Sequence, residues 1–91
     1  MSAIALEALA DVTGGQLVGG SVPLQTLAID SREVKAGDLF AALSGQRVDG
    51  HDFAPQALAA GASALLTERE LEGLVPQLVV ADVLEASGHF G

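Results

Sequence analysis

Cysteine is absent from this sequence, and aromatic residues make up only 3% of it. Without thiols, the fold cannot depend on a disulfide framework or on a cysteine-rich zinc site. Hydrophobic residues nevertheless account for 49% of the 91 residues, and many of them are Ala and Leu. A chain of this length and composition is expected to fold as one globular domain with an aliphatic core.

Cations are scarce as well. Four Lys and Arg residues stand against 12 Asp and Glu residues, which leaves a formal net charge of −8. Nucleic acids and anionic membrane surfaces are bound through clustered cations, so neither is an expected partner. No apolar run approaches the ~20 residues of a membrane span, and the first residues lack the basic start of a secretory signal. We therefore expect a cytoplasmic protein without membrane insertion, and a monomer.

Sequence motifs of common small enzymes are also missing. Lys35 is the single lysine and follows Val34, which excludes the Gly-Lys-Ser/Thr of a phosphate-binding loop. The two histidines, His51 and His89, do not form a close zinc-binding pair, and no GxSxG nucleophile motif occurs. We expect no catalytic residue, no metal and no cofactor within these residues.

Extended and helical patterns alternate along the chain. The sequence predicts strands at residues 16–18, 24–29, 39–43, 64–67 and 77–80. The run LFAAL at 39–43 is apolar throughout, as in a strand that is buried on both faces. The alternation predicts an α/β fold, a small layered domain with a mixed, mainly parallel sheet and flanking short helices.

Three short helices are expected between these strands: at about residues 5–13, from about Asp52 to Gly61, and after Asp82. In the second helix, Asp52 is the expected N-cap and Pro55 lies in the first turn. Helical spacing then predicts one apolar face, formed by Phe53, Ala54, Ala57, Leu58 and Ala60.

Two polar loops follow predicted strands, Asp30–Arg32 and Gly45–Gly50. Open α/β sheets bind ligands outside the carboxyl ends of their strands. Three of the four cations, Arg32, Lys35 and Arg47, lie in or beside these loops, and a guanidinium suits a phosphate. The pattern indicates an anion-binding edge. The alternative is that the two arginines are surface residues, each paired with a nearby carboxylate.

Asp49 and Asp52 flank His51, which raises the question of a metal or acid–base cluster. Asp and His at the beginning of a helix more often cap it and meet the positive end of its dipole. We therefore interpret these residues as helix capping.

Four motifs follow one another in a characteristic order: DSR at 30–32, GDLFAALSG at 37–45, DGHDF at 49–53 and GASALL at 61–66. In this order they resemble the N-terminal domain of the Mur ligases, which extend UDP-N-acetylmuramoyl peptides in peptidoglycan synthesis. The TGG at 13–15 and PQLVV at 76–80 extend the resemblance over nearly the whole chain. It is closer to the members that add D-alanyl-D-alanine to the tripeptide than to those that add the third amino acid to the dipeptide.

The resemblance implies that residues 1–91 form a domain that binds the UDP end of UDP-N-acetylmuramoyl-tripeptide. It implies that Ile29 and Ser31 lie near the uridine and pyrophosphate, and that Arg32 supports the pyrophosphate or braces its loop. It assigns Gln46, Arg47 and Val48 to the uracil side, whereas His51, Asp52 and Phe53 cap and pack the following helix.

The family's chemistry uses ATP and Mg²⁺ to phosphorylate the substrate carboxylate, which the incoming amine then attacks. The resemblance assigns this work to a central domain and a C-terminal domain that these 91 residues do not contain. Such a chain would hold substrate without converting it. The alternative is a domain that has kept the fold and lost the ligand. Its partner protein would then bind an acidic surface formed by Glu68, Glu70, Glu72, Asp82 and Glu85.

Overall fold

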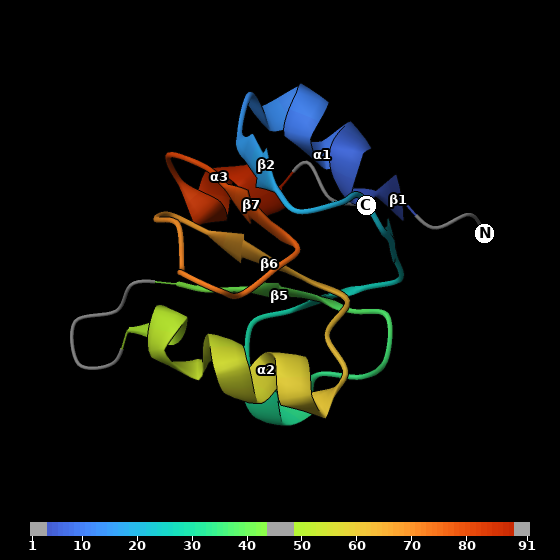
Figure 1. The fold of residues 1–91 in the computed structure, drawn as a ribbon, viewed down its shortest axis with the longest axis vertical. Helices are drawn as coiled ribbons and strands as arrows, with labels where there is room; N and C mark the ends of the chain where they lie inside the picture. The colour runs from blue at the N-terminus through green and yellow to red at the C-terminus, as the bar shows by residue number, and fades with distance from the viewer. Residues whose placement is uncertain (1–3, 44–48, 89–91) are drawn as a thin grey trace.

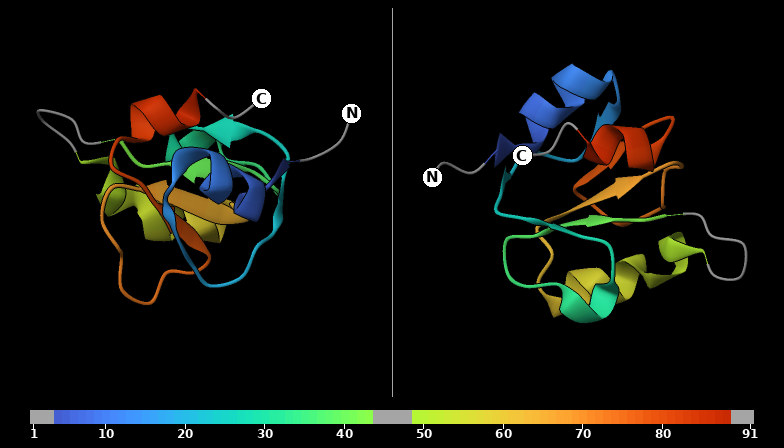
Figure 2. Two further views of the ribbon diagram at one scale, coloured as in Figure 1. Left: turned by 90° about the horizontal axis from the view of Figure 1, so that it is seen from above. Right: turned by 180° about the vertical axis from the view of Figure 1, so that it is seen from behind.

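The computed structural model describes residues 4–43 and 49–88, which are arranged in three layers (Figure 1). In chain order the elements are β1 Ile4–Ala5, α1 Leu6–Thr13, β2 Gln16–Val18, β3 Pro23–Leu24, β4 Leu27–Ala28, the 3₁₀ turn η1 Ser31–Glu33, β5 Leu39–Ala41, the 3₁₀ turn η2 Gly50–Phe53, α2 Ala54–Ala60, β6 Ala64–Thr67, β7 Gln77–Val79 and α3 Val83–Ser87. Helices α1 and α3 lie on one side of the central sheet, and α2 and η1 lie on the other (Figures 1 and 2).

The central sheet has five strands in the order β2-β7-β6-β5-β4. Its four strands from β4 to β7 are parallel, and β2 runs antiparallel to β7 at one edge. A separate two-stranded antiparallel sheet joins β1 to β3, with Ile4 opposite Leu24. The prediction of an α/β domain with a mixed, mainly parallel sheet is confirmed, while the strand at Ile4–Ala5 was not predicted.

Strand β5 shows why the sheet is buried on both faces. Leu39 and Ala41 contact the core beneath α1 and α3, and the alternate residues Phe40 and Ala42 contact the core beneath α2. Successive side chains of a strand point to opposite faces, so a continuously apolar run serves two cores at once. The buried strand at 39–43 is therefore confirmed, although the regular strand ends at Ala41.

The expected strand at 24–29 is wrong as a single element. Leu24 belongs to β3, whereas β4 begins at Leu27 and pairs with β5 in the other sheet. Both leucines pack against the core beneath α1 and α3. Residues three apart in one straight strand would point to opposite faces, so the chain must bend between them. The bend is held where Gln25 N–H donates to Gly37 O at 2.8 Å.

The start of α2 also differs from the sequence expectation. Asp49, rather than Asp52, provides the cap, because its carboxylate accepts a hydrogen bond from His51 N–H at the start of η2. Helix α2 follows directly, with Pro55 in its first turn as expected. Ala54 and Ala57 are buried on the predicted apolar face, but Phe53 and Ala60 are exposed. Helix α2 is only two turns long and begins and ends at the surface. Few of its residues therefore face the core.

Helix α1 begins without a side-chain cap in its own sequence. Instead, Glu7 N–H donates to Ser21 Oγ at 3.0 Å, and Leu6 N–H donates to Val22 O at 2.9 Å. The helix ends at Gly14, whose φ of 71° is the left-handed conformation that glycine adopts without strain. Within the described residues, no helix is long and apolar enough to cross a bilayer.

Candidate functional site

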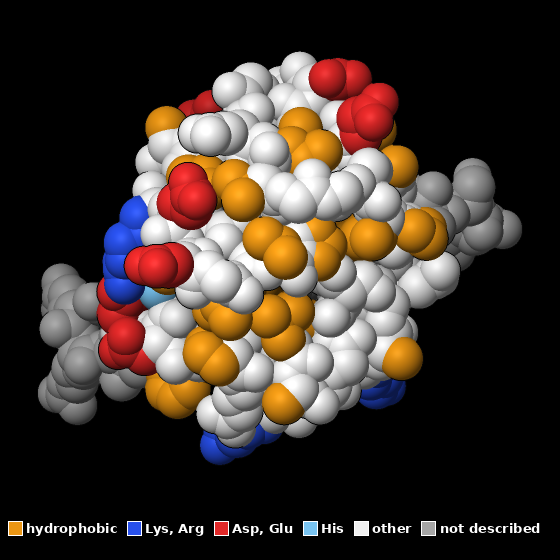
Figure 3. Space-filling view, viewed as in Figure 1, with side chains coloured by type: hydrophobic (Ala, Val, Ile, Leu, Met, Phe, Trp, Pro, Cys, Tyr) orange, Lys and Arg blue, Asp and Glu red, His pale blue; other side chains and the backbone are white. Residues whose placement is uncertain are grey.

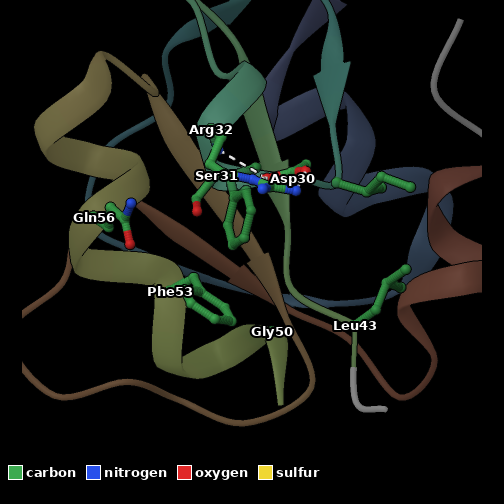
Figure 4. A pocket seen from close by; sticks show the side chains of 9 residues that line it. Asp30, Ser31, Arg32, Leu43, Gly50, Phe53 and Gln56 are labelled. Atoms are coloured by element: carbon green, nitrogen blue, oxygen red, sulfur yellow. Dashed lines mark hydrogen bonds and ion pairs between the residues drawn. The ribbon is translucent and has the colours of Figure 1, made fainter. Parts of the chain in front are cut away.

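A cleft of about 610 Å³ lies at the carboxyl ends of β4 and β5. Its wall is formed by residues that follow β4 and enter η1, by β5 and the second residue after it, and by η2 and α2. The lining residues are Ile29, Asp30, Ser31, Arg32, Phe40, Leu43, Gly50, Phe53 and Gln56 (Figure 4). This is the edge at which parallel α/β sheets bind ligands, because the strand ends and their loops leave a crevice there.

An ion pair stands at one side of the cleft. Asp30 Oδ2 accepts from the Arg32 guanidinium at 2.8 Å, and Asp30 Oδ1 accepts from Arg32 Nε at 3.1 Å and from its backbone N–H at 2.9 Å. These bonds, the side-chain ones first, lower the pKa of the Asp30 carboxyl from 3.8 to about 2, and the pKa of Arg32 is raised in return. The Arg32 side chain is 81% exposed, so its remaining donors can reach a ligand.

Two uncharged polar groups lie in the same cleft. Ser31 is buried in η1, and Gln56 extends from α2. In Figure 4 the Ser31 hydroxyl and the Gln56 amide lie on one side of the cleft, with Phe53 next to them. A hydroxyl and a primary amide can each donate and accept hydrogen bonds, which suits a ligand with polar edges.

The remaining lining is apolar. Phe40 is almost fully buried, whereas Ile29 and Phe53 are 62% and 39% exposed. Large apolar side chains gathered in a cleft are covered when a flat or apolar part of a ligand binds. With an exposed guanidinium beside this surface, the cleft suits a ligand that joins a planar apolar group to an anion.

Among the described residues that line the cleft, no pair of side chains is suited to acid–base or nucleophilic catalysis. The one carboxylate in this set, Asp30, is held by Arg32, and the set offers no histidine to Ser31. Within the described residues, no group of three or more His, Asp or Glu side chains could hold a metal ion. The arrangement can bind and orient a ligand.

The structure brings together three of the six residues expected to bind ligand: Ile29, Ser31 and Arg32 all line the cleft. The other three, Gln46, Arg47 and Val48, lie outside the described residues. The alternative interpretation of Arg32 also finds support, because this arginine is paired with Asp30. Lys35 is exposed in the turn after η1 and is not among the lining residues.

Sequence reasoning missed Gln56 and treated Phe53 only as a packing residue, whereas both line the cleft. The spacing of Phe53 and Gln56 could have indicated that they lie side by side. Residues three apart at the beginning of a helix lie on the same side of it, so Gln56 could have been placed next to the residue that ends the DGHDF motif.

Comparison with known proteins gives a consistent result. A family model described as "Mur ligase family, catalytic domain" matches residues 23–88. The UDP-N-acetylmuramoyl-tripeptide–D-alanyl-D-alanine ligase of Escherichia coli (strain K12) is 44% identical over 89 residues, which is 98% of this chain and 20% of the relative. The UDP-N-acetylmuramoyl-L-alanyl-D-glutamate–2,6-diaminopimelate ligase of Geobacillus kaustophilus is 48% identical over 64 residues, which is 70% of this chain and 13% of the relative.

Solved structures agree with the sequence matches. A crystal structure of MurF from Acinetobacter baumannii superimposes with a TM-score of 0.76 at 30% identity, covering 94% of this chain and 20% of that one. MurF from Thermotoga maritima, in complex with ADP, gives a TM-score of 0.63 at 36% identity, covering 67% and 14%. The chain spans at most about a fifth of the length of these relatives, and the resemblance expected from its motifs is confirmed.

Proposed function

This chain belongs to the Mur ligase family, and on that premise we propose that it binds the UDP end of UDP-N-acetylmuramoyl-tripeptide. The whole protein is, in this proposal, a cytoplasmic ATP-dependent amide ligase that adds D-alanyl-D-alanine to that tripeptide in peptidoglycan synthesis. The long match to the D-alanyl-D-alanine ligase of E. coli supports this choice within the family. A ligase that adds diaminopimelate to the UDP-muramoyl dipeptide is the runner-up, because such relatives match between 63% and 90% of the chain, against 98% for the E. coli enzyme.

The observation that carries the proposal is the cleft, because Ile29, Ser31 and Arg32 meet there. The family resemblance assigns these residues to the uridine and pyrophosphate. The apolar side chains of Ile29 and Phe53 suit the face of a pyrimidine ring, and the Arg32 fork suits a phosphate. The same resemblance assigns Gln46, Arg47 and Val48 to the uracil side, and we retain them as proposed contacts.

ATP and Mg²⁺ belong to the proposed ligase as a whole, but the residues of this chain do not fit them. Lys35 is the only lysine, and it lies in a turn rather than at the start of a helix. There its backbone N–H donates to Asp38 Oδ2 at 2.9 Å. A phosphate-binding loop would need successive free backbone N–H groups and a lysine at a helix N-terminus. We therefore assign phosphoryl transfer to parts of the ligase beyond these 91 residues.

The alternative of a protein-interaction module receives less support. On the face shown in Figure 3, the acidic side chains form separate groups rather than one continuous surface. Two of the five acidic residues also serve the fold, since Glu68 accepts from Val83 N–H and Asp82 accepts from Glu85 N–H at the start of α3. No observation in the described residues favours a protein partner over a nucleotide ligand.

The proposal is tested by titrating the chain with UDP-N-acetylmuramoyl-tripeptide and following amide NMR shifts. We expect weak binding, because other domains would normally bury the rest of the ligand. The shifts should cluster at Ser31, Phe53 and Gln56 and include Gln46–Val48. R32A should weaken binding about tenfold, as expected when a charge-assisted hydrogen bond is lost.

K35A is the matched control, because it removes the same charge from an exposed residue outside the cleft. It should bind like the wild type. Equal losses in R32A and K35A would mean that only the overall charge matters. An absence of shifts at Ser31 with millimolar ligand would reject the proposal. Comparing the tripeptide ligand with the dipeptide ligand then separates the two types of ligase.

A further inference from the structure

A buried histidine lies behind the cleft wall. The side chain of His51 is fully buried, although the residue stands in the short turn η2. Its Nδ1 lies 2.7 Å from Asp49 Oδ1, and its Nε2 lies 2.9 Å from Glu68 N. Both ring nitrogens therefore have a partner, and His51 does not line the cleft.

These two contacts fix the proton on the ring. A backbone N–H can only donate, so Nε2 must accept from Glu68 and carries no hydrogen. The ring proton is then on Nδ1, where it is donated to the Asp49 carboxylate. The observed geometry thus requires a neutral imidazole in one tautomer.

The ring connects two segments that are distant in sequence. Asp49 to Phe53 form the turn that supplies Gly50 and Phe53 to the cleft, and Glu68 follows directly after β6. On its other side the turn is held by Gly50 N–H, which donates to Leu43 O at 2.7 Å. A Cβ at Gly50 would lie only 2.6 Å from Leu43 N, so the backbones are already in close contact. The turn is clamped between the end of β5 and the end of β6.

The charged groups around the ring are satisfied in this arrangement. Asp49 Oδ2 accepts from Arg69 at 2.9 Å, and the Glu68 carboxylate accepts from Val83 N–H at 2.9 Å. The hydrogen bonds from the His51 backbone and ring, followed by that from Arg69, hold the pKa of the Asp49 carboxyl well below its usual range. Asp49 therefore stays charged and can accept the hydrogen bond from the ring.

We propose that His51 is a positioning residue for this cleft, and that its neutral ring holds the Gly50–Phe53 wall in the conformation that binds ligand. The ligand part of this inference rests on the proposed function. A second proton on the ring would sit on Nε2 and face the N–H of Glu68. Two buried donors would then oppose each other without an acceptor, which is a costly arrangement. The turn must move away from β6, and Phe53 moves with it.

Two substitutions separate the two contacts of the ring. In H51Q, the side chain is long enough to present Oε1 near the position of Nε2, so the contact with Glu68 N–H can be kept. In H51N, the side chain reaches only the position of Nδ1 and can donate to Asp49 alone. Neither side chain titrates. Thermal unfolding of both variants shows whether a change in binding reflects a general loss of the fold.

The dissociation constant for UDP-N-acetylmuramoyl-tripeptide is measured for the wild type and for both variants at one neutral pH. H51Q should bind within about twofold of the wild type, because the contact with Glu68 N–H is kept. H51N should bind about fivefold more weakly, the equivalent of one hydrogen bond. H89Q is the control for the other histidine and should bind like the wild type.

A measurement without ligand tests the positioning role by itself. In H51N, the amide resonances of Glu68, Gly50 and Phe53 should move away from their wild-type positions, whereas in H51Q the Glu68 resonance should stay close to its wild-type position. Wild-type positions of all three resonances in H51N would overturn the inference. So would equal binding of ligand by wild type and H51N. If the resonances respond but no variant binds the ligand, the positioning role stands and the proposed function fails.

Discussion

At the scale of single residues, the pair Asp30–Arg32 shows how an anion-binding group is held at the cleft. The guanidinium is bonded to a carboxylate two residues away, in an arrangement that also caps η1. Asp30 occupies only the edge of the guanidinium formed by Nε and Nη2. A phosphate can therefore accept from the remaining donors without displacing Asp30.

The first prediction concerns the acid titration of Asp30. Its pKa is lowered to about 2 from 3.8, so the pair contributes to stability above about pH 4 and loses that contribution as the pH falls toward 2. In R32A the pKa of Asp30 should rise part of the way back toward 3.8, because only the backbone hydrogen bond remains, and the acid-dependent part of the stability should shrink. Carboxyl-carbon NMR titration measures the first effect, and unfolding curves recorded as a function of pH measure the second.

K35A again provides the comparison, since Lys35 makes no side-chain contact with Asp30 in the structure. Asp30 should keep its low pKa in that variant. If Asp30 still titrated near pH 2 in R32A, the lowered pKa would have to come from the backbone hydrogen bond alone.

The sequence predicted three of the nine described residues that line the cleft, Ile29, Ser31 and Arg32. A serine and an arginine after a strand are visible in sequence, because polar residues at that place rarely serve the core. Phe53 and Gln56 were not recognised as lining residues. Their role depends on how η2 turns into α2, and that turn is set by Asp49 and His51 through contacts with Glu68 and Arg69 in another part of the chain. Helical spacing links Gln56 to Phe53, but it cannot show that the two residues lie beside the loop that follows β4.

At the scale of elements, the loop between β6 and β7 depends on one side chain. Gln77, the first residue of β7, is fully buried. Its Nε2 donates to Leu71 O at 2.6 Å and to Leu74 O at 2.5 Å, while its Oε1 accepts from Leu71 N–H at 2.9 Å. A loop without regular structure thereby has its inward-facing backbone groups paired.

The second prediction follows from these bonds. Q77L should lower the free energy of unfolding by about 2–4 kcal/mol, because several partly buried backbone groups lose their partner together. T67V should cost about 1 kcal/mol or less, because it removes only the 3.3 Å bond from Thr67 Oγ1 to Gln77 Oε1. Chemical denaturation gives both values, and hydrogen exchange at Leu71 reports the loop directly. A Q77L variant as stable as T67V would show that water replaces the amide without cost.

Most elements were predictable because they are short and bounded by strong local signals. The strands at 16–18 and 64–67 were predicted with their observed bounds. The error at 24–29 has a tertiary cause, since Leu24 and Leu27 must reach the same core from a chain that looks like one continuous strand. The unpredicted strand at Ile4–Ala5 exists only because it pairs with β3. A strand of two residues is too short to show the alternation of apolar and polar residues by which strands are predicted from sequence.

At the scale of the whole molecule, one sheet serves two cores. Adjacent residues of β6 face opposite sides: Leu65 packs beneath α2, and Leu66 packs beneath α1 and α3. Neither core can lose its strand without disturbing the other, because both use the same backbone. A domain of this size is also expected to unfold in a single cooperative step.

The third prediction uses this pair. L65A and L66A should each lower the free energy of unfolding by about 2–5 kcal/mol, because each leaves a cavity in a fully buried layer. In both variants the amides of α1 and α2 should lose their protection from hydrogen exchange together. If L66A opened α1 at a denaturant concentration where α2 stayed protected, the two layers would be separate folding units.

The two edges of the central sheet have a consequence for behaviour at high protein concentration. Strand β4 has two residues and β2 has three, so each edge offers a neighbouring molecule only a few unpaired backbone groups. Long, flat edge strands are the places where chains pair into aggregates. Short edge strands offer too few unpaired backbone groups for such pairing. Together with a net charge of −8, which makes copies repel one another, these edges disfavour aggregation through strand pairing at high concentration.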